Sequence, residues 1–106
     1  MKQVVNMLKK IGLPYAYDHF AEGESPKPPF ICYLSASSDN FAADGKVYFK
    51  FDEIHLELYA DKKDPKLESK VEDALDVAEI FYDKTETWIE SEKLYEVLYT
   101  FRLEAD

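Results

Sequence analysis

The feature that most constrains the fold is a long alternation of apolar and polar residues in the middle of the chain. Its apolar positions change parity once, from Val47, Phe49 and Phe51 to Ile54, Leu56, Leu58 and Ala60. A period of two is typical of a strand with one buried face, and one inserted residue moves every later side chain to the opposite face. We therefore expect a long, bent strand with a β-bulge or sharp bend at 52–53.

Two other segments have the spacing of amphipathic helices. Near the start, Val4, Leu8 and Ile11 recur on one helical face, and the following Gly-Leu-Pro ends the pattern. In segment 61–80, Asp64 is a good N-cap and Pro65 suits the first helical position. The apolar stripe of this second helix consists of Leu67, Val71, Ala74, Leu75 and Ala78.

The remaining apolar runs predict further strands. Segment 15–20 is short and aromatic, and 30–34 (FICYL) is apolar throughout, which is typical of a strand covered on both faces. Segments 82–90 and 93–104 flank a turn near 90–92 and predict a hairpin. The last strand places Leu94 and Leu98 on one face, and the other face carries Tyr95, Val97, Tyr99, Phe101 and Leu103.

These elements predict the order α-β-β-β-α-β-β. Strands linked by hairpins, with helices gathered together, favour an α+β fold with a single mixed, mostly antiparallel sheet and two helices packed on one side. The chain has 106 residues, of which 46% are apolar, so we expect one domain over residues 1–106 with one core.

The charge of the chain is strongly lopsided. The net charge is −9, and residues 1–51 contribute +1 (six Lys, five acids) against −10 from residues 52–106 (seven Lys or Arg, 17 acids). An acidic surface repels phosphate, so tight binding of nucleic acid is not expected. No apolar run approaches the roughly 18 residues that cross a bilayer, and the start is amphipathic with lysines rather than a signal-peptide core. The single cysteine cannot close an internal disulfide, which favours synthesis in a reducing cytosol.

No residue pattern points to a reaction. Glu53, His55 and Glu57 alternate on one strand face in a spacing that a divalent ion can use, but a solvated strand face looks the same. Cys32 lies inside an apolar run and is interpreted as a buried small hydrophobe. The sequence has no Gly-rich phosphate loop, nucleophile elbow, HExxH or paired-cysteine zinc spacing. We assign no catalytic, cofactor-binding or metal-binding residue and do not expect an enzyme.

Two surface features keep two interpretations each. The segment PKPP at 26–29 fits a polyproline ligand, or a stiff lead-in to the next strand. The acidic side of the second helix is a solvated face by default, or a surface that repels DNA or meets a basic partner. Its members are Glu68, Glu72, Asp73, Asp76 and Glu79.

The polar segment 37–46 contains one aromatic residue, Phe41, and its neighbours in the sequence are too polar to bury the ring. We expect a loop of about ten residues, longer than most hairpin connections and of a length that is often functional. Phe41 either covers the chain's own core or inserts into a neighbouring subunit, and both interpretations stay open. The candidate residues for contact between subunits are Asp39, Asn40, Phe41, Asp44, Tyr48, Leu94 and Leu98.

Several stretches, in order and spacing, resemble a family of small proteins of long-tailed bacteriophages and prophages. They are LPYAYDHF, KPPFICYL, SDNFAADGKVY, LELYADKKDPKLESKVEDAL and WIESEKLYEVLY, and together they cover almost the whole chain. Members of the family are described as tail completion, tail terminator or head–tail joining proteins. The predicted element order also resembles the fold of tail terminator and tail-to-head joining proteins.

The resemblance implies a structural protein that forms a ring, typically of six copies, at the head-proximal end of the tail. Its implied partners are other copies of itself, the tail tube and head connector proteins. DNA would pass through the ring without tight binding, and the protein would occupy the host cytoplasm during assembly and then the virion. The alternative is an acidic DNA mimic that inhibits a DNA-binding protein, which requires carboxylates spaced like phosphates over an extended face.

Overall fold

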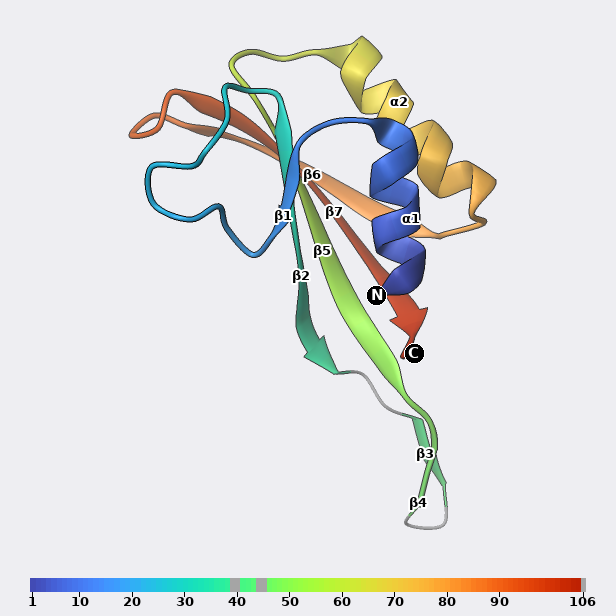
Figure 1. Cartoon of the computed structure of the whole chain (residues 1–106). Coiled ribbons are helices and arrows are strands. Elements are labelled where there is room, and N and C mark those ends of the chain that lie inside the picture. The colour runs from blue at the N-terminus through green and yellow to red at the C-terminus, as the bar shows by residue number, and fades with distance from the viewer. Residues whose placement is uncertain (39–40, 44–45, 106) are drawn as a thin grey trace.

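The protein is an α+β fold in which two helices cover one face of a five-stranded sheet (Figure 1). The computed structural model describes residues 1–38, 41–43 and 46–105, and for 41–43 and 46–49 it describes the backbone alone. The expected fold class is confirmed. The elements are α1 (Lys2–Ile11), β1 (Tyr15–Tyr17), β2 (Phe30–Ser38), β3 (Phe41–Ala43), β4 (Lys46–Phe49), β5 (Phe51–Ala60), α2 (Pro65–Val77), β6 (Tyr82–Ile89) and β7 (Leu94–Glu104).

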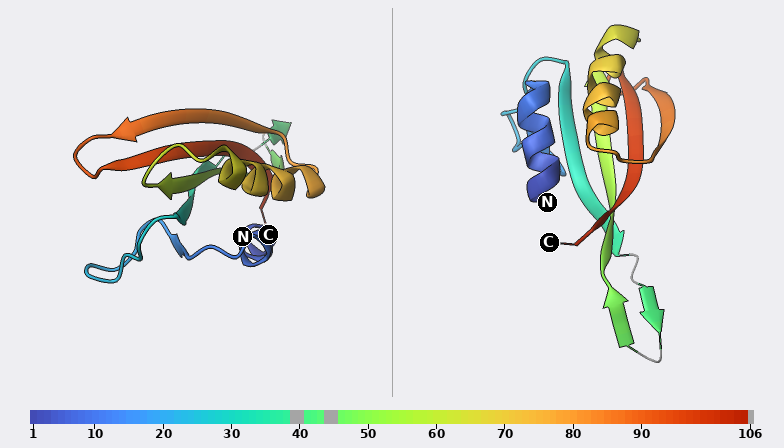
Figure 2. Two further views of the ribbon diagram at one scale, coloured as in Figure 1. Left: turned by 90° about the horizontal axis from the view of Figure 1, so that it is seen from above. Right: turned by 90° about the vertical axis from the view of Figure 1, so that its right-hand side faces the viewer.

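The main sheet has the strand order β1-β2-β5-β7-β6. β1 runs parallel to β2, and every other pair in this sheet is antiparallel, so the sheet is mixed and mostly antiparallel as expected. Both helices lie against the same side of the sheet, which leaves the opposite side without a helix (Figure 2). We call that opposite side the helix-free face.

The two helices form where the spacing of apolar residues and the capping residues predict them. Val4, Leu8 and Ile11 are at most 2% exposed, and α1 ends at Gly12, whose φ of +83° allows its N–H to bond the carbonyl of Leu8 at 3.1 Å. At the start of α2, the carboxylate of Asp64 accepts a hydrogen bond from the N–H of Leu67 at 3.1 Å. This bond satisfies one of the donors that a helix N-terminus otherwise leaves free.

The core lies between the helices and the sheet. Each of its fully buried aliphatic side chains contributes about 1.5–3 kcal/mol relative to exposure, so their sum outweighs any single polar contact. The fully buried members include Val4, Leu8, Ile31, Ile54, Leu56, Leu58, Val71, Leu75 and Tyr99.

The β-bulge expected at 52–53 is wrong in its position. β5 pairs with β7 in unbroken register from Phe51 opposite Glu104 to Ala60 opposite Tyr95. The register shift lies on the other neighbour, β2, between Ser35 and Ser37. The change of parity falls within β5 itself: Phe51 lies on the helix-free face, where Arg102 of β7 is 4.8 Å from the centre of its ring, and Ile54 is buried on the opposite face. The run as a whole is divided at Lys50 between two separate sheets.

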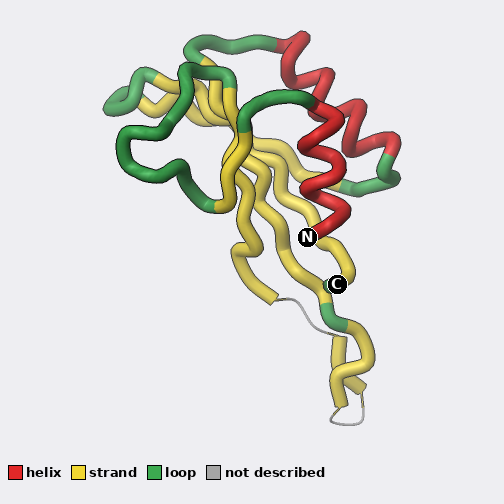
Figure 3. Tube along the Cα trace, in the orientation of Figure 1, coloured by secondary structure: helices red, strands yellow, loops and turns green. Residues whose placement is uncertain are grey.

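The loop expected over 37–46 is also wrong where the structure describes it. β2 continues to Ser38, and Phe41–Ala43 forms β3, which pairs with β4 in antiparallel register. We call β3 and β4 together the arm. It extends beyond the end of the main sheet, away from both helices (Figures 1 and 3), and lengthens the molecule to 49 Å against 30 and 23 Å in the other directions.

Candidate functional site

The candidate contact residues that the structure describes do not form one cluster. Asp39, Asn40 and Asp44 lie outside the described residues. Phe41 belongs to β3 and Tyr48 to β4, so the backbone places both in the arm. Both interpretations of Phe41, as a cover of the core and as an intersubunit contact, stay predictions.

Leu94 and Leu98 lie far from the arm, toward the other end of the sheet. The arm joins β5 next to the end of β7, where the N–H of Ala105 bonds the carbonyl of Lys50 at 2.7 Å. Glu104 lies ten positions after Leu94 in β7, which corresponds to roughly 33 Å of extended strand. Both leucines are partly buried on the helix-free face, where Leu98 stands between Glu57 and Thr85 of the neighbouring strands. The candidates therefore mark two separate surfaces.

The helix-free face holds acidic and aromatic side chains rather than a reactive constellation. The hydroxyl of Tyr59 donates a hydrogen bond to the Glu57 carboxylate at 3.1 Å. Burial raises the pKa of Glu57, the bond from Tyr59 opposes this shift, and the charge of Glu96 adds to it. Cys32, which pairs across the strands with Glu57, is 5% exposed, and burial raises the pKa of its thiol to about 11. The thiol is therefore protonated at neutral pH, and Cys32 is a buried small residue, as its apolar run predicted, although it lies on the helix-free face.

The strand triplet Glu53, His55 and Glu57 does not converge. His55 Nε2 lies 3.5 Å from a carboxylate oxygen of Glu53, a distance typical of a loose surface pair. Within residues 1–38, 41–43 and 46–105, no group of three or more His, Cys, Asp or Glu side chains is arranged to hold a metal ion.

The acidic side of α2 is not one solvated face, which corrects its default interpretation. Glu68 is 3% exposed, and its Oε1 lies 2.8 Å from the ammonium groups of both Lys63 and Lys84. Lys84 also reaches Glu72 at 2.8 Å, and Glu72 accepts a further bond from the Tyr99 hydroxyl at 2.8 Å. Glu68 and Glu72 therefore pair with Lys84 of β6 and with Lys63 of the connection before α2, and of the five acids only Asp73, Asp76 and Glu79 are exposed.

The C-terminal end of α2 carries an exposed apolar surface that the sequence did not reveal. Val77 is 81% exposed and Phe81, just before β6, is 97% exposed. Val77 lies off the apolar stripe, and Phe81 follows the buried Ile80, so one of these two neighbours had to point outward. That succession of two large apolar residues at a strand start is the one signal that would have found the surface.

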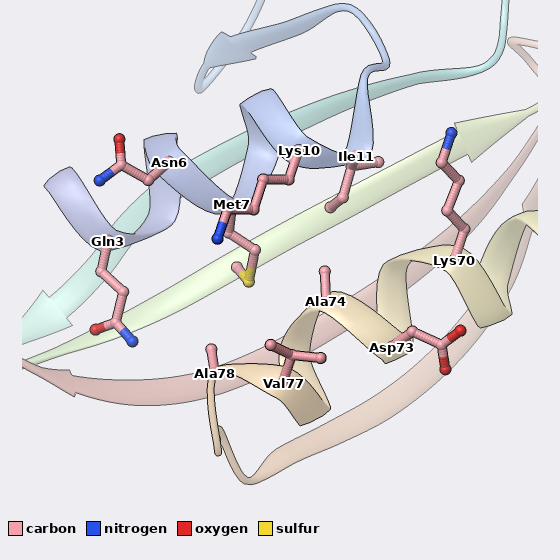
Figure 4. Close-up of a pocket in the computed structure, with 10 residues that line it drawn as sticks. All are labelled: Gln3, Asn6, Met7, Lys10, Ile11, Lys70, Asp73, Ala74, Val77 and Ala78. Carbon is pink, nitrogen blue, oxygen red and sulfur yellow. The ribbon is translucent and has the colours of Figure 1, made fainter.

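Val77 also lines a hollow between the two helices, which we call the interhelix groove (Figure 4). The groove has a volume of about 600 Å³. Met7 and Ile11 of α1 face Ala74, Val77 and Ala78 of α2 across it. Because the two helices are separated by more than 50 residues in the chain, no local pattern could have indicated the groove.

The main sheet leaves backbone groups at its two edges. β6 is one edge, and the short β1 covers only Ile31–Tyr33 of β2 at the other. Beyond that point, the N–H of Ser35 bonds the hydroxyl of Tyr17 at 3.1 Å. Open strand edges of this kind can pair with another chain.

Comparison with known proteins adds no further assignment. No protein-family model matches the chain, and no curated protein matches it. Among the described residues, neither helix has the length and apolar character needed to cross a membrane.

Proposed function

We propose that this chain is a structural subunit that assembles with copies of itself into a ring at the head-proximal end of a phage tail. It would act there as a tail terminator, tail completion or head–tail joining protein, with the tail tube and head connector proteins as neighbours. It carries out no reaction in this role. It is made in the host cytoplasm and ends in the virion.

The observation that carries the proposal is the arm. In the part of the chain that the structure describes, the arm pairs with no strand of the main sheet and extends beyond it, and such a two-stranded sheet is well suited to contact between subunits. Six of the seven residues in β3 and β4 are apolar, namely Phe41, Ala42, Ala43, Val47, Tyr48 and Phe49. An isolated two-stranded hairpin is marginally stable in water, so a hairpin of this composition gains most from burial against a partner.

The charge of the chain agrees with passage of DNA through such a ring. A net charge of −9 repels the phosphate backbone of DNA, and tight non-specific binding needs several phosphate contacts from Lys or Arg. DNA therefore slides past the joint without sticking.

The alternative role as a DNA mimic is less well supported. A mimic needs free carboxylates in a phosphate-like array, but Glu68 and Glu72 are held by Lys63 and Lys84 beneath α2. Only part of the negative charge of residues 52–106 is therefore free on one surface to imitate phosphates.

Sedimentation velocity over a wide range of concentrations tests the proposal, with the chain alone and with tail tubes of the phage or prophage that encodes it. A ring subunit shifts from monomer to a closed oligomer, or leaves the supernatant with the tubes. A chain that stays monomeric in both cases, but competes with DNA for a nuclease or repressor, supports the mimic instead. The genes on either side provide an independent check, because portal, adaptor and major tail genes are expected there.

A further inference from the structure

The outer edge of β6 is a long strand edge, and no strand among the described residues pairs with it. β6 is the last strand of the main sheet, where it lies on the outside (Figure 2), and it pairs with β7 in unbroken register from Tyr82 to Ile89. Along such an edge, the N–H and C=O groups of every second residue point outward and are available to a further strand.

β6 lacks the features by which edge strands usually avoid pairing with another chain. Its sequence, YDKTETWI, contains no proline or glycine, and its register with β7 has no bulge. A lysine often guards an edge, but the ammonium of Lys84, the only lysine in β6, lies 2.8 Å from each of Glu68 and Glu72 of α2. The edge is therefore open to a strand from another chain.

Two large apolar side chains are exposed near the two ends of this edge. Phe81, directly before β6, is 97% exposed, and Trp88 is 44% exposed. The indole Nε1 of Trp88 already donates a hydrogen bond to Glu90 at 2.6 Å, so the carbon atoms of its ring are the part without cover. Exposed aromatic residues of this kind are frequent anchors of protein interfaces.

Residues 81–89 are complementary to a second copy of themselves. A twofold axis perpendicular to the sheet makes two β6 strands antiparallel and keeps the helix-free faces of both copies on the same side. Residues that lie opposite each other then share a face, and an axis at Thr85 pairs Thr85 with itself. The other opposed residues are Phe81 with Ile89, Tyr82 with Trp88, Asp83 with Thr87 and Lys84 with Glu86, each pair occurring twice.

Charge favours this register over its neighbours. An axis at Asp83, Lys84 or Glu86 places that charged residue opposite itself, and like charges directly opposite each other are destabilising. With the axis at Thr85, Lys84 faces Glu86 of the second copy, and no two like charges are opposed. Both side chains are already held in their own chain, Lys84 by Glu68 and Glu86 by Tyr95, so the contact continues an existing polar network.

We propose that β6 pairs antiparallel with β6 of a second copy of this chain, with the twofold axis at Thr85. The two five-stranded sheets become one continuous sheet, Ile89 of the second copy covers Phe81, and Tyr82 of the second copy covers Trp88. The contact is isologous and closes a pair of copies, so it is distinct from the head-to-tail contacts of a ring and does not rest on the proposed function. It is small, so the pair forms at high protein concentration.

Disulfide cross-linking tests the register. In Thr85→Cys the two introduced thiols lie directly opposite each other, with Cα atoms about 4.5–5.5 Å apart, which a disulfide spans. Mild oxidation should therefore give a covalent dimer on a non-reducing gel, after free thiols are blocked. Asp83→Cys and Thr87→Cys are controls on the same strand face, where the thiols of two copies are four positions, or roughly 13 Å, apart. Neither control should cross-link alone, but a mixture of the two should.

A matched pair of charge variants tests the contact without a covalent bond. Thr85→Lys places two ammonium groups opposite each other at the axis and should raise the dissociation constant of the pair about fivefold. Thr87→Lys makes the same change two residues away, where the new ammonium faces Asp83 of the second copy, and should leave the dissociation constant unchanged or lower it. Both threonines are exposed, so the thermal midpoints of the two variants at low concentration should match that of the unaltered chain.

The outcomes decide the contact separately from the ring. Cross-linking of Thr85→Cys and of the mixture, with neither control cross-linked alone, supports the pairing. If Thr85→Cys gives no covalent dimer, or if all three single variants cross-link equally, the pairing is wrong. If Thr85→Lys and Thr87→Lys associate equally well, the register is wrong. Rings on tail tubes, present or absent, change neither conclusion.

Discussion

The ion-pair network beneath α2 makes a specific prediction for Lys84→Met. The ammonium of Lys84 lies 2.8 Å from Oε1 of Glu68 and 2.8 Å from Oε2 of Glu72, so one side chain ties both acids of α2 to β6. Methionine keeps the length of the side chain and removes the charge. Glu68 then keeps Lys63, and Glu72 keeps the hydroxyl of Tyr99.

The expected cost follows from what each acid loses. A hydrogen bond to a charged group contributes about 1.5–3 kcal/mol, and removing one partner of a buried pair costs about 3–5 kcal/mol when the other charge is left alone. Here neither acid is left alone, and Lys84 no longer has to be desolvated, so we expect a net loss of about 2 kcal/mol. For a domain of this size such a loss lowers the thermal midpoint by about 8 °C.

The pH dependence of this loss has a defined sign. Burial alone would raise the pKa of Glu72, but the hydrogen bonds from Lys84 and Tyr99, together with the charge of Lys84, outweigh burial and lower it. A lowered carboxyl pKa stabilises the fold above the unfolded pKa, and this stabilisation disappears as the pH falls through the folded value. The difference between Lys84→Met and the unaltered chain should therefore shrink in acid.

Urea unfolding followed by circular dichroism measures the loss, with Lys66→Met as the control. Lys66 is exposed on α2, and no ion pair to it is found among the residues that the structure describes. Its replacement should change stability by less than about 0.5 kcal/mol. If Lys84→Met costs no more than Lys66→Met, the network does not hold α2 on the sheet and the reasoning fails.

Four further predictions follow from burial, capping and charge. Phe101→Ala, at a site 4% exposed, should cost about 3–5 kcal/mol in urea unfolding; a cost below about 1 kcal/mol would contradict its place in the core. Asp64→Ala should cost about 1 kcal/mol through loss of the N-cap bond, with an unchanged midpoint as the opposing result. Cys32 should resist a thiol reagent at neutral pH in the native state and react in urea, whereas rapid native labelling would show an accessible thiolate. Glu57→Gln should raise the urea midpoint at neutral pH, because burial raises the pKa of Glu57 and penalises its charge; this gain should fade in acid, and a loss at neutral pH would contradict it.

The fold could be predicted because the buried residues of each helix or strand recur along the sequence with the period of that element. The spacing of Val4, Leu8 and Ile11 is set by the turn of a helix, and all three are buried in α1. The alternation along β7 likewise separates the core-facing Val97 and Tyr99 from Leu98 on the helix-free face. Such patterns need only the neighbouring residues of the same element.

Two wrong predictions concern the bulge and the acidic side of α2, and both features depend on residues that are distant in the chain. The parity change between Phe51 and Ile54 suggested a bulge in that strand, but β5 keeps one register with β7 and the register shift lies on β2, which depends on how the strands pair. Glu68 looked solvated on a helical wheel, but Lys84 on β6, 16 residues later, lies over it. Residue type and spacing do not reveal such a partner.

The candidate surfaces divide in the same way. Phe41 is an aromatic residue in a polar segment, and the backbone places it and Tyr48 in the arm. Their role in contact between subunits remains a prediction. The interhelix groove could not be predicted from the sequence, because it forms only when Met7 of α1 and Ala74 of α2 lie opposite each other.

The central claim is that copies of this chain assemble into a ring on a tail, and electron microscopy tests it most directly. Tail tubes built from the major tail protein of the same phage or prophage are mixed with the purified chain and imaged. The account predicts a ring of added density at one end of each tube and a matching loss of free monomer. Tubes that stay bare at both ends, beside an undiminished pool of monomer, would contradict it.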